Sequence, residues 1–201
     1  MIFYPALLTK SIADAKEKLK IVKGIKRLHL DVMDGDFVKN KTIPILRLKP
    51  LLRKKYVQAH IMCYHPEKYI ADCKKIGVKE FIFHIEATRK PEKVIEAVKK
   101  KKMKVGIALN PITSLKRITP YLTKINTVLV MTVHPGFSGQ QFQRSALKKI
   151  PLLRKRKVKV GVDGGVSPET AKLIKADFIC AASSVFKAKE PKKVLKKLQR
   201  V

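Results

Sequence analysis

The sequence predicts an α/β protein whose eight parallel strands close into a compact (β/α)8 TIM barrel. Short apolar runs alternate with amphipathic stretches along all 201 residues, a pattern typical of parallel sheets with helical crossovers. There are eight such runs, the count that closes this barrel, and the chain lies near the barrel's lower length limit of about 200 residues. A doubly wound open sheet is the alternative, but no Gly-x-Gly-x-x-Gly motif follows the first run. We expect a single domain over residues 1–201.

The eight expected strands are short and rich in Val, Ile, Leu and Phe, as strands buried on both faces are. Each is followed by polar or turn-forming residues before the next amphipathic stretch. Their ranges are Phe3–Leu8, Ile25–Val32, Tyr56–Met62, Glu80–Ile85, Met103–Leu109, Thr127–Val133, Val158–Asp163 and Phe178–Ala181.

Start signals mark most of the expected helices. The Ser11-Ile-Ala-Asp14 string resembles a capping box, and Ser167 is an expected N-cap before Pro168. The last segment, Pro191–Val201, places its apolar residues on one face and lysines on the other. The weakest expected helix is Ser114–Tyr121, because Pro120 limits it. Two further helices are expected to begin at prolines, Pro66 and Pro91.

The chain is strongly basic, with 46 Lys and Arg against 15 Asp and Glu and a net charge of +31. Such a charge attracts polyanions. However, Lys outnumbers Arg 37 to 9 and aromatic residues make up only 6%, which favours a solvated surface over a base-reading or stacking one. We therefore expect no nucleic-acid partner.

The sequence also bears on location. No apolar run approaches the roughly 18 residues of a membrane span, and the N-terminus lacks the order of a signal peptide. Three scattered cysteines, Cys63, Cys73 and Cys180, form neither a disulfide framework nor a CxxC knuckle. We expect a soluble, cytoplasmic protein with no membrane partner.

Unusual polar residues gather where the expected strands end, the place where barrel active sites form. His29, Asp31 and Met33 alternate on one strand and so share a face. A single His-x-Asp pair is commonly only a hydrogen-bonded pair at a strand end. Here His60 and Asp163 lie at comparable strand ends, so two imidazoles and two carboxylates can converge. This ligand set suits Zn²⁺, Fe²⁺ or Mn²⁺.

Six strings resemble the ribulose-phosphate 3-epimerase family and occur in that family's order. They cover most of the chain, from about Phe3 to Phe186, and read LHLDVMDGDFVKNKT, AHIM, FHIEAT, GIALNPITSL, VLVMTVHPGFSGQQF and VDGGVSPET. The resemblance implies a ribulose-phosphate-binding (β/α)8 barrel that interconverts D-ribulose 5-phosphate and D-xylulose 5-phosphate.

The resemblance also implies roles at matching positions. His29, Asp31, His60 and Asp163 match the family's four ligands to one divalent metal ion per chain, for which we expect zinc, iron(II), manganese or cobalt. Asp31 and Asp163 also match its two acid/base carboxylates. Two opposed carboxylates can epimerise a carbon beside a carbonyl through an enediolate if one is ionised and the other protonated.

The expected substrate-binding residues fall into four groups. Methionines match those beside the reacting carbons, although gap-filling in the core is the alternative. A glycine-rich stretch resembles the mobile sixth loop, and backbone N–H groups after the seventh and eighth strands suit a phosphate, although an ordinary tight turn is the alternative there. Thr9 stands where the family has Ser. The residues are Thr9, His60, Met33, Met62, Met131, Gly136, Phe137, Ser138, Gly139, Gly164, Gly165, Ala182 and Ser183.

Two other functions remain open at this stage. A related epimerase could act on a phosphorylated ketohexose such as allulose 6-phosphate, and a non-catalytic basic barrel could bind polyanions. Retention of all four ligands argues against the second. We expect a phosphorylated ketose substrate and a homo-oligomer. His84 and Glu86 share a face and are expected to support the site rather than bind metal.

Overall fold

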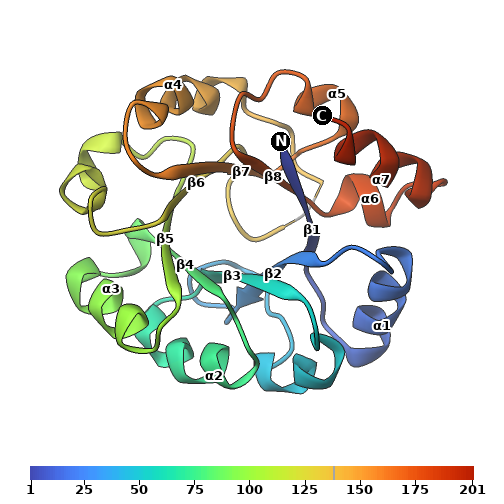
Figure 1. Ribbon diagram of the computed structural model, residues 1–201, viewed down its shortest axis with the longest axis horizontal. Coiled ribbons are helices and arrows are strands. Elements are labelled where there is room, and N and C mark those ends of the chain that lie inside the picture. The colour runs from blue at the N-terminus through green and yellow to red at the C-terminus, as the bar shows by residue number, and fades with distance from the viewer. Residues whose placement is uncertain (138) are drawn as a thin grey trace.

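The computed structural model describes residues 1–137 and 139–201, and its eight strands form one closed parallel barrel in the order β1 to β8 (Figure 1). Each strand pairs with the next in the chain, and β1 pairs with β8. The barrel prediction is confirmed and the open-sheet alternative is wrong. The strands are β1 Ile2–Leu7, β2 Arg27–Met33, β3 Tyr56–Met62, β4 Glu80–His84, β5 Lys104–Leu109, β6 Thr127–Met131, β7 Lys159–Asp163 and β8 Phe178–Ala181.

Helices surround the barrel (Figure 1). Two expected start signals are present, since the Ser11 side chain accepts a hydrogen bond from the Asp14 backbone N–H and the Ser167 side chain accepts two at α5. The α-helices are α1 Ile12–Ile21, α2 Ile70–Lys75, α3 Pro91–Lys100, α4 Lys149–Arg154, α5 Pro168–Ala171, α6 Ser183–Phe186 and α7 Pro191–Gln199. The 3₁₀ helices are η1 Ile45–Leu51, η2 Pro66–Tyr69, η3 Ile85–Ala87, η4 Leu115–Arg117, η5 Thr119–Tyr121 and η6 Arg144–Lys148.

Two crossovers differ from the expected strand–helix alternation. The expected helix Ser114–Tyr121 is wrong, because the segment forms the two short turns η4 and η5. The crossover from β2 to β3 holds only η1, which contains Pro50. Proline lacks the N–H that an α-helix interior needs, so the tighter 3₁₀ turns replace a regular helix in both places.

The barrel interior is divided into an apolar part and a polar part. Side chains such as Tyr4, Leu129 and Phe178 fill the apolar part, to which β1, β4, β5, β6 and β8 contribute. Gly161 makes room for the Phe178 ring, because a Cβ built there would lie 2.0 Å from it. Large and small residues thus alternate around the barrel and fill its centre.

The polar part runs along β2, β3 and β4 and is buried. The register pairs His29 with Gln58 and Gln58 with Glu80, so these three residues lie side by side on adjacent strands. One layer towards the carboxyl ends of the strands, Asp31 pairs with His60. A series of buried polar groups on neighbouring strands requires internal hydrogen-bond partners. The barrel therefore carries a polar network that runs from its carboxyl-terminal mouth to Glu80 at the start of β4.

No helix within residues 1–137 and 139–201 is both long and apolar enough to cross a membrane. The three cysteines are buried free thiols.

Candidate metal and proton-transfer site

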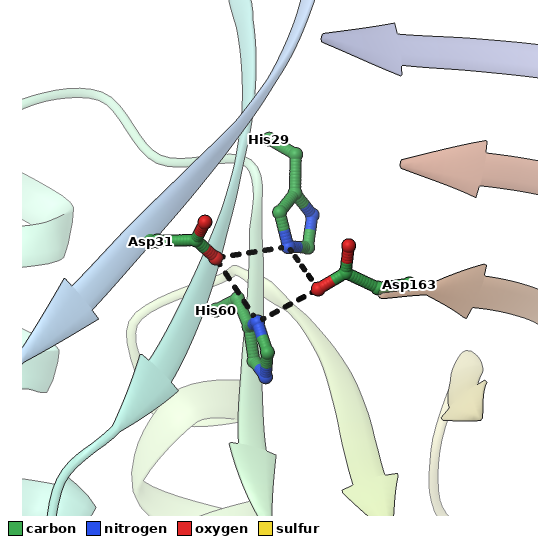
Figure 2. A group of neighbouring side chains, drawn as sticks. All are labelled: His29, Asp31, His60 and Asp163. Carbon is green, nitrogen blue, oxygen red and sulfur yellow. Dashed lines mark hydrogen bonds and ion pairs between the residues drawn. The ribbon is translucent and has the colours of Figure 1, made fainter. Parts of the chain in front are cut away.

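Four side chains converge at the carboxyl ends of the strands (Figure 2). His29 and Asp31 come from β2, His60 from β3 and Asp163 from β7. The Nδ1 atom of His60 lies 3.2 Å from Asp31 Oδ1 and 3.6 Å from Asp163 Oδ2. The Nε2 atom of His29 lies 3.5 Å and 4.0 Å from the same two oxygens. One ligand atom from each of the four residues lies within 4.8 Å of all the others.

The residues fit a single transition-metal ion. Imidazole nitrogens and carboxylate oxygens are the donors that zinc, iron(II), manganese and cobalt take in proteins. His29 is fully buried, and its Nε2 atom finds no hydrogen-bond partner in the described part of the chain although it faces both carboxylates. A buried ring nitrogen without a partner is costly unless it has a ligand to bind. A metal ion bound here would be that ligand. The structure thus brings together His29, Asp31, His60 and Asp163, as the sequence predicts.

The pKa values of the Asp31 and Asp163 carboxyl groups are shifted in opposite directions. Burial alone would raise the pKa of Asp31, but the neighbouring imidazoles of His29 and His60 hold it well below its usual range. Burial raises the pKa of Asp163, and the negative charge of Asp31 raises it further. The two carboxyl groups thus differ in how readily they ionise, and an acid/base pair requires such a difference.

His29 is held from behind by a buried amide. Its Nδ1 atom lies 2.7 Å from Gln58 Oε1, and Gln58 Nε2 donates to Glu80 Oε2 at 2.9 Å. Thr127 Oγ1 donates to the other oxygen of Glu80. Sequence reasoning missed Gln58 and Glu80. The signal available in the sequence is that both are polar residues within otherwise largely apolar strands, with Gln58 two residues before His60.

His60 is held by a third histidine of the polar network, His84. Its Nε2 atom lies 2.8 Å from His84 Nε2, and His84 Nδ1 lies 3.3 Å from Glu86 Oε2. Glu86 Oε1 accepts hydrogen bonds from the Asn110 backbone N–H at 3.0 Å and from the Thr113 hydroxyl. Burial would raise the pKa of Glu86, but the hydrogen bond from His84 and those from Thr113 and Asn110 lower it to about 2.

A cavity opens above the four side chains. Asp31 and Asp163 form part of its wall, whereas His60 lies beneath it and is fully buried. Of the expected substrate residues, the cavity is lined by Met33, Met62, Met131, Gly136, Phe137, Gly139, Gly164, Gly165, Ala182 and Ser183. Sequence reasoning missed Leu8, Val133, Pro135, Val166, Cys180 and Ala181, which also line it. The expected residue Ser138 lies outside the described residues.

Thr9 lies apart from this cavity. Its side chain is buried, and its hydroxyl donates to the Ser11 backbone oxygen at 2.8 Å. Leu8 lines the cavity instead. Contact between Thr9 and a substrate therefore stays a prediction.

The Gly164-Gly165 turn requires glycine at both positions. Their φ angles are +103° and +63°, and a Cβ on Gly164 would lie 2.5 Å from the Val133 side chain. Both glycines and the α6 residue Ser183 line the cavity. Backbone N–H groups of such a turn can approach an anion closely, because no side chain intervenes.

Comparisons with known proteins agree on one family. The model of the ribulose-phosphate 3 epimerase family matches residues 2–186. The chain is 36% identical to the cytoplasmic isoform of ribulose-phosphate 3-epimerase from Oryza sativa subsp. japonica, covering 98% of this chain and 92% of the relative. It is 37% identical to ribulose-phosphate 3-epimerase from Schizosaccharomyces pombe, with 97% and 91% covered.

Solved structures agree with the fold. A 3-hexulose-6-phosphate synthase from Salmonella typhimurium superposes with a TM-score of 0.77 at 17% identity, covering 100% of this chain and 97% of that one. KGPDC from Streptococcus mutans also superposes with a TM-score of 0.77, at 16% identity, covering 99% and 95%. At these identities the likeness concerns the barrel alone.

Proposed function

Because the chain belongs to the ribulose-phosphate 3-epimerase family, we propose that it interconverts D-ribulose 5-phosphate and D-xylulose 5-phosphate. One observation in the structure carries the proposal. Two carboxyl groups line the same cavity, face the same two imidazoles and have pKa values shifted in opposite directions. Epimerisation at a carbon beside a carbonyl needs a base on one face of that carbon and an acid on the other.

In the proposed reaction the ionised carboxylate of Asp31 removes the proton from C3 on one face. The protonated carboxyl group of Asp163 then delivers a proton to the opposite face, and the two residues exchange roles in the reverse direction. The thioethers of Met33, Met62 and Met131 line the cavity around this carbon and carry no exchangeable proton, so they exclude water without competing for the transfer. The Gly164-Gly165 turn and Ser183 are proposed to bind the phosphate.

We propose that His29, Asp31, His60 and Asp163 hold one divalent ion, with zinc, iron(II), manganese and cobalt as the candidates. A bound ion supplies a Lewis acid that polarises the substrate's carbonyl group and stabilises negative charge beside it. Elemental analysis of the purified protein should find about one such ion per chain, and His60→Ala should weaken its binding. Absence of metal after reconstitution with all four ions would contradict the site.

Proton exchange at C3 tests the reaction. Metal-reconstituted protein in D₂O should convert ribulose 5-phosphate to xylulose 5-phosphate and place deuterium at C3, which NMR detects directly. The same assay with allulose 6-phosphate separates the pentose reaction from that of a ketohexose epimerase. Failure to exchange the C3 proton of either sugar with fully metallated protein would refute the proposal.

Location and assembly are further proposals. Three buried free thiols suit a reducing compartment, and the relative from rice is named a cytoplasmic isoform, so we propose a cytoplasmic location. A homo-oligomer stays a prediction that sedimentation or size-exclusion measurements decide.

A further inference from the structure

We propose that Glu86 is a positioning residue: acting through His84, it fixes the His60 ring in the tautomer that turns a bare Nδ1 atom towards the metal. The inference rests on the proposed metal site but not on the identity of the substrate. It concerns the half-buried Glu86 and two buried histidines, whose carboxylate oxygens and ring nitrogens follow one another in a single series from Glu86 through His84 to His60.

The series begins with the direction of the hydrogen bonds at Glu86. A carboxylate only accepts hydrogen bonds. Its Oε1 atom is occupied by the Asn110 backbone N–H and the Thr113 hydroxyl, and its Oε2 atom faces His84 Nδ1. The Nδ1 atom of His84 must therefore carry the proton and donate it.

The next contact fixes His60. A neutral imidazole carries one N–H, so a His84 ring protonated at Nδ1 presents a bare Nε2 atom. That atom lies 2.8 Å from His60 Nε2, which must then be the donor. The remaining nitrogen of His60, Nδ1, is left bare and faces the carboxylates of Asp31 and Asp163. Only a bare nitrogen can ligate a metal.

His29 follows the same rule through different groups. Glu80 accepts from Gln58 Nε2, which orients the amide so that its oxygen faces His29 Nδ1. His29 must donate from Nδ1, and its Nε2 atom is left bare on the side of the metal site. Each histidine is thus set by a glutamate that does not reach the site, and the two rings present different nitrogens, Nε2 and Nδ1.

Glu86→Gln tests the inference because the geometry dictates how the new amide must turn. The amide oxygen has to face the fixed Asn110 N–H, which leaves the NH₂ group facing His84 Nδ1. His84 then has to accept at Nδ1 and donate from Nε2, and His60 has to accept at Nε2 and carry its proton on Nδ1. The substitution keeps the size of the side chain but reverses the direction of both hydrogen bonds. The proton on His60 Nδ1 then blocks this nitrogen as a metal ligand.

The expected result is a zinc dissociation constant raised by about 10- to 100-fold, the usual cost of losing such support, measured by competition with a chromogenic chelator. Glu67→Gln is the matched control. Glu67 also pairs with a histidine, with its Oε1 atom 3.4 Å from His65 Nδ1, but both side chains are exposed. Within the described residues, the hydrogen bonds of His84 and His60 involve neither of them. This control should keep the dissociation constant of the unsubstituted protein.

Histidine tautomers, read from long-range ¹H–¹⁵N NMR correlations, separate positioning from simple loss of charge. The unsubstituted, zinc-loaded protein should show His84 protonated at Nδ1 and His60 protonated at Nε2. Metal-free Glu86→Gln should show the reverse. Unchanged zinc affinity in the variant, weaker affinity with unchanged tautomers, or an Nε2-protonated His84 in the unsubstituted protein would each overturn the proposal. The last measurement decides the question even if the variant does not fold, and a protein that binds no zinc at all would refute the metal site instead.

Discussion

Asp31 and Asp163 face the same two imidazoles, yet burial and charge act on them with opposite results. The neighbouring imidazoles lower the pKa of Asp31, whereas the negative charge of Asp31 raises the pKa of Asp163. Two identical side chains can therefore perform different roles at one pH. The difference in pKa depends on the neighbouring groups rather than on the residue type. It is therefore lost when either aspartate is replaced by the neutral amide asparagine.

Replacing either aspartate should stop epimerisation but leave half of the chemistry. Asp31→Asn and Asp163→Asn should each lower the epimerisation rate by about 100-fold or more, the scale of a positioned acid or base. Each variant should still exchange the C3 proton of one epimer with D₂O, because the remaining aspartate serves its own face. The losses should not multiply in the double variant, because one missing partner already stops the cycle.

Metal content has to be measured in each of these variants, because both aspartates are also proposed ligands. A fully metallated single variant that epimerises ribulose 5-phosphate near the unsubstituted rate would show that the two-aspartate mechanism is wrong.

Glu86 should make the free energy of unfolding depend on pH in the acidic range. Its pKa in the folded protein is about 2, below its usual value of 4.5, so its ionised form favours the native state. The contribution is fully present above pH 4.5 and is lost as the pH falls from 4.5 towards 2. The metal-free protein should therefore exceed Glu86→Gln in free energy of unfolding at neutral pH, with the gap narrowing below pH 4.5. Urea titrations at several pH values measure this gap; a gap independent of pH would argue against the shifted carboxyl group.

The sequence of one strand by itself predicts some site residues but not others. His29 and Asp31 could be predicted to share a face, because residues two apart on a strand do so. Gln58 and Glu80 could not be assigned a role, because their hydrogen bonds depend on the register between β3 and β4, which neither strand's own sequence specifies.

At the level of elements, the loops after β2 and β6 are joined by one buried amide. Asn40 Nδ2 donates to the Gly136 backbone oxygen at 2.7 Å, and Val38 packs against the same glycine, whose added Cβ would lie 3.0 Å from Val38 Cβ. Gly136 and Phe137 line the cavity. The loop after β2 therefore helps to place the cavity wall contributed by the loop after β6.

Asn40→Ala should weaken this connection. The free energy of unfolding should fall by about 1–3 kcal/mol, because a buried carbonyl loses its donor, and the KM for the sugar phosphate should rise because Gly136 and Phe137 are less firmly placed. Steady-state kinetics and urea titrations provide both values. Asn126→Ala is the control: Asn126 accepts from the Val105 backbone N–H at 2.9 Å at the opposite end of the barrel, so it should lose stability without a change in KM. An equal rise in KM in both variants would contradict a role of the Asn40–Gly136 hydrogen bond in placing the cavity wall.

The sequence predicted all eight strands because buried parallel strands are continuous apolar runs that need no knowledge of their neighbours. It predicted the crossovers less well. The segment around Pro120 and the one containing Pro50 fold into 3₁₀ turns, because proline removes a backbone donor while tertiary packing still holds the chain against the barrel. Whether a short amphipathic segment forms α or 3₁₀ turns depends on that packing rather than on its own pattern.

At the scale of the whole molecule, the excess of basic residues lies at the surface, whereas a few acidic groups belong to the inner polar network. That network contains Asp31, Asp163, Glu80 and Glu86, out of only 15 acidic residues in the chain. The outer helices α3 and α7 carry lysines on their exposed faces. The net charge of +31 is thus largely a property of the solvated surface.

Duplex DNA should bind this surface weakly and without sequence preference. Contacts that depend on lysine and phosphate alone are lost steeply with salt, so fluorescence anisotropy should show little binding at about 0.2 M salt. A scrambled duplex of the same length serves as the control. Tight binding that persists at this salt concentration, or a preference for one sequence, would indicate a nucleic-acid function in addition to the proposed epimerase.

The origin of the four proposed ligands has a kinetic consequence for folding. Three of them come from the adjacent strands β2 and β3, whereas Asp163 comes from β7, which reaches them only when the circle of strands is completed by pairing β8 with β1. Pairing of segments so distant in sequence carries a large loop-closure cost and is a slow event. A fragment or intermediate that ends before β7 has three donors and no complete site. An ion at the proposed site would therefore be captured only at the last stage of folding, and it would stabilise the finished barrel without helping to nucleate it.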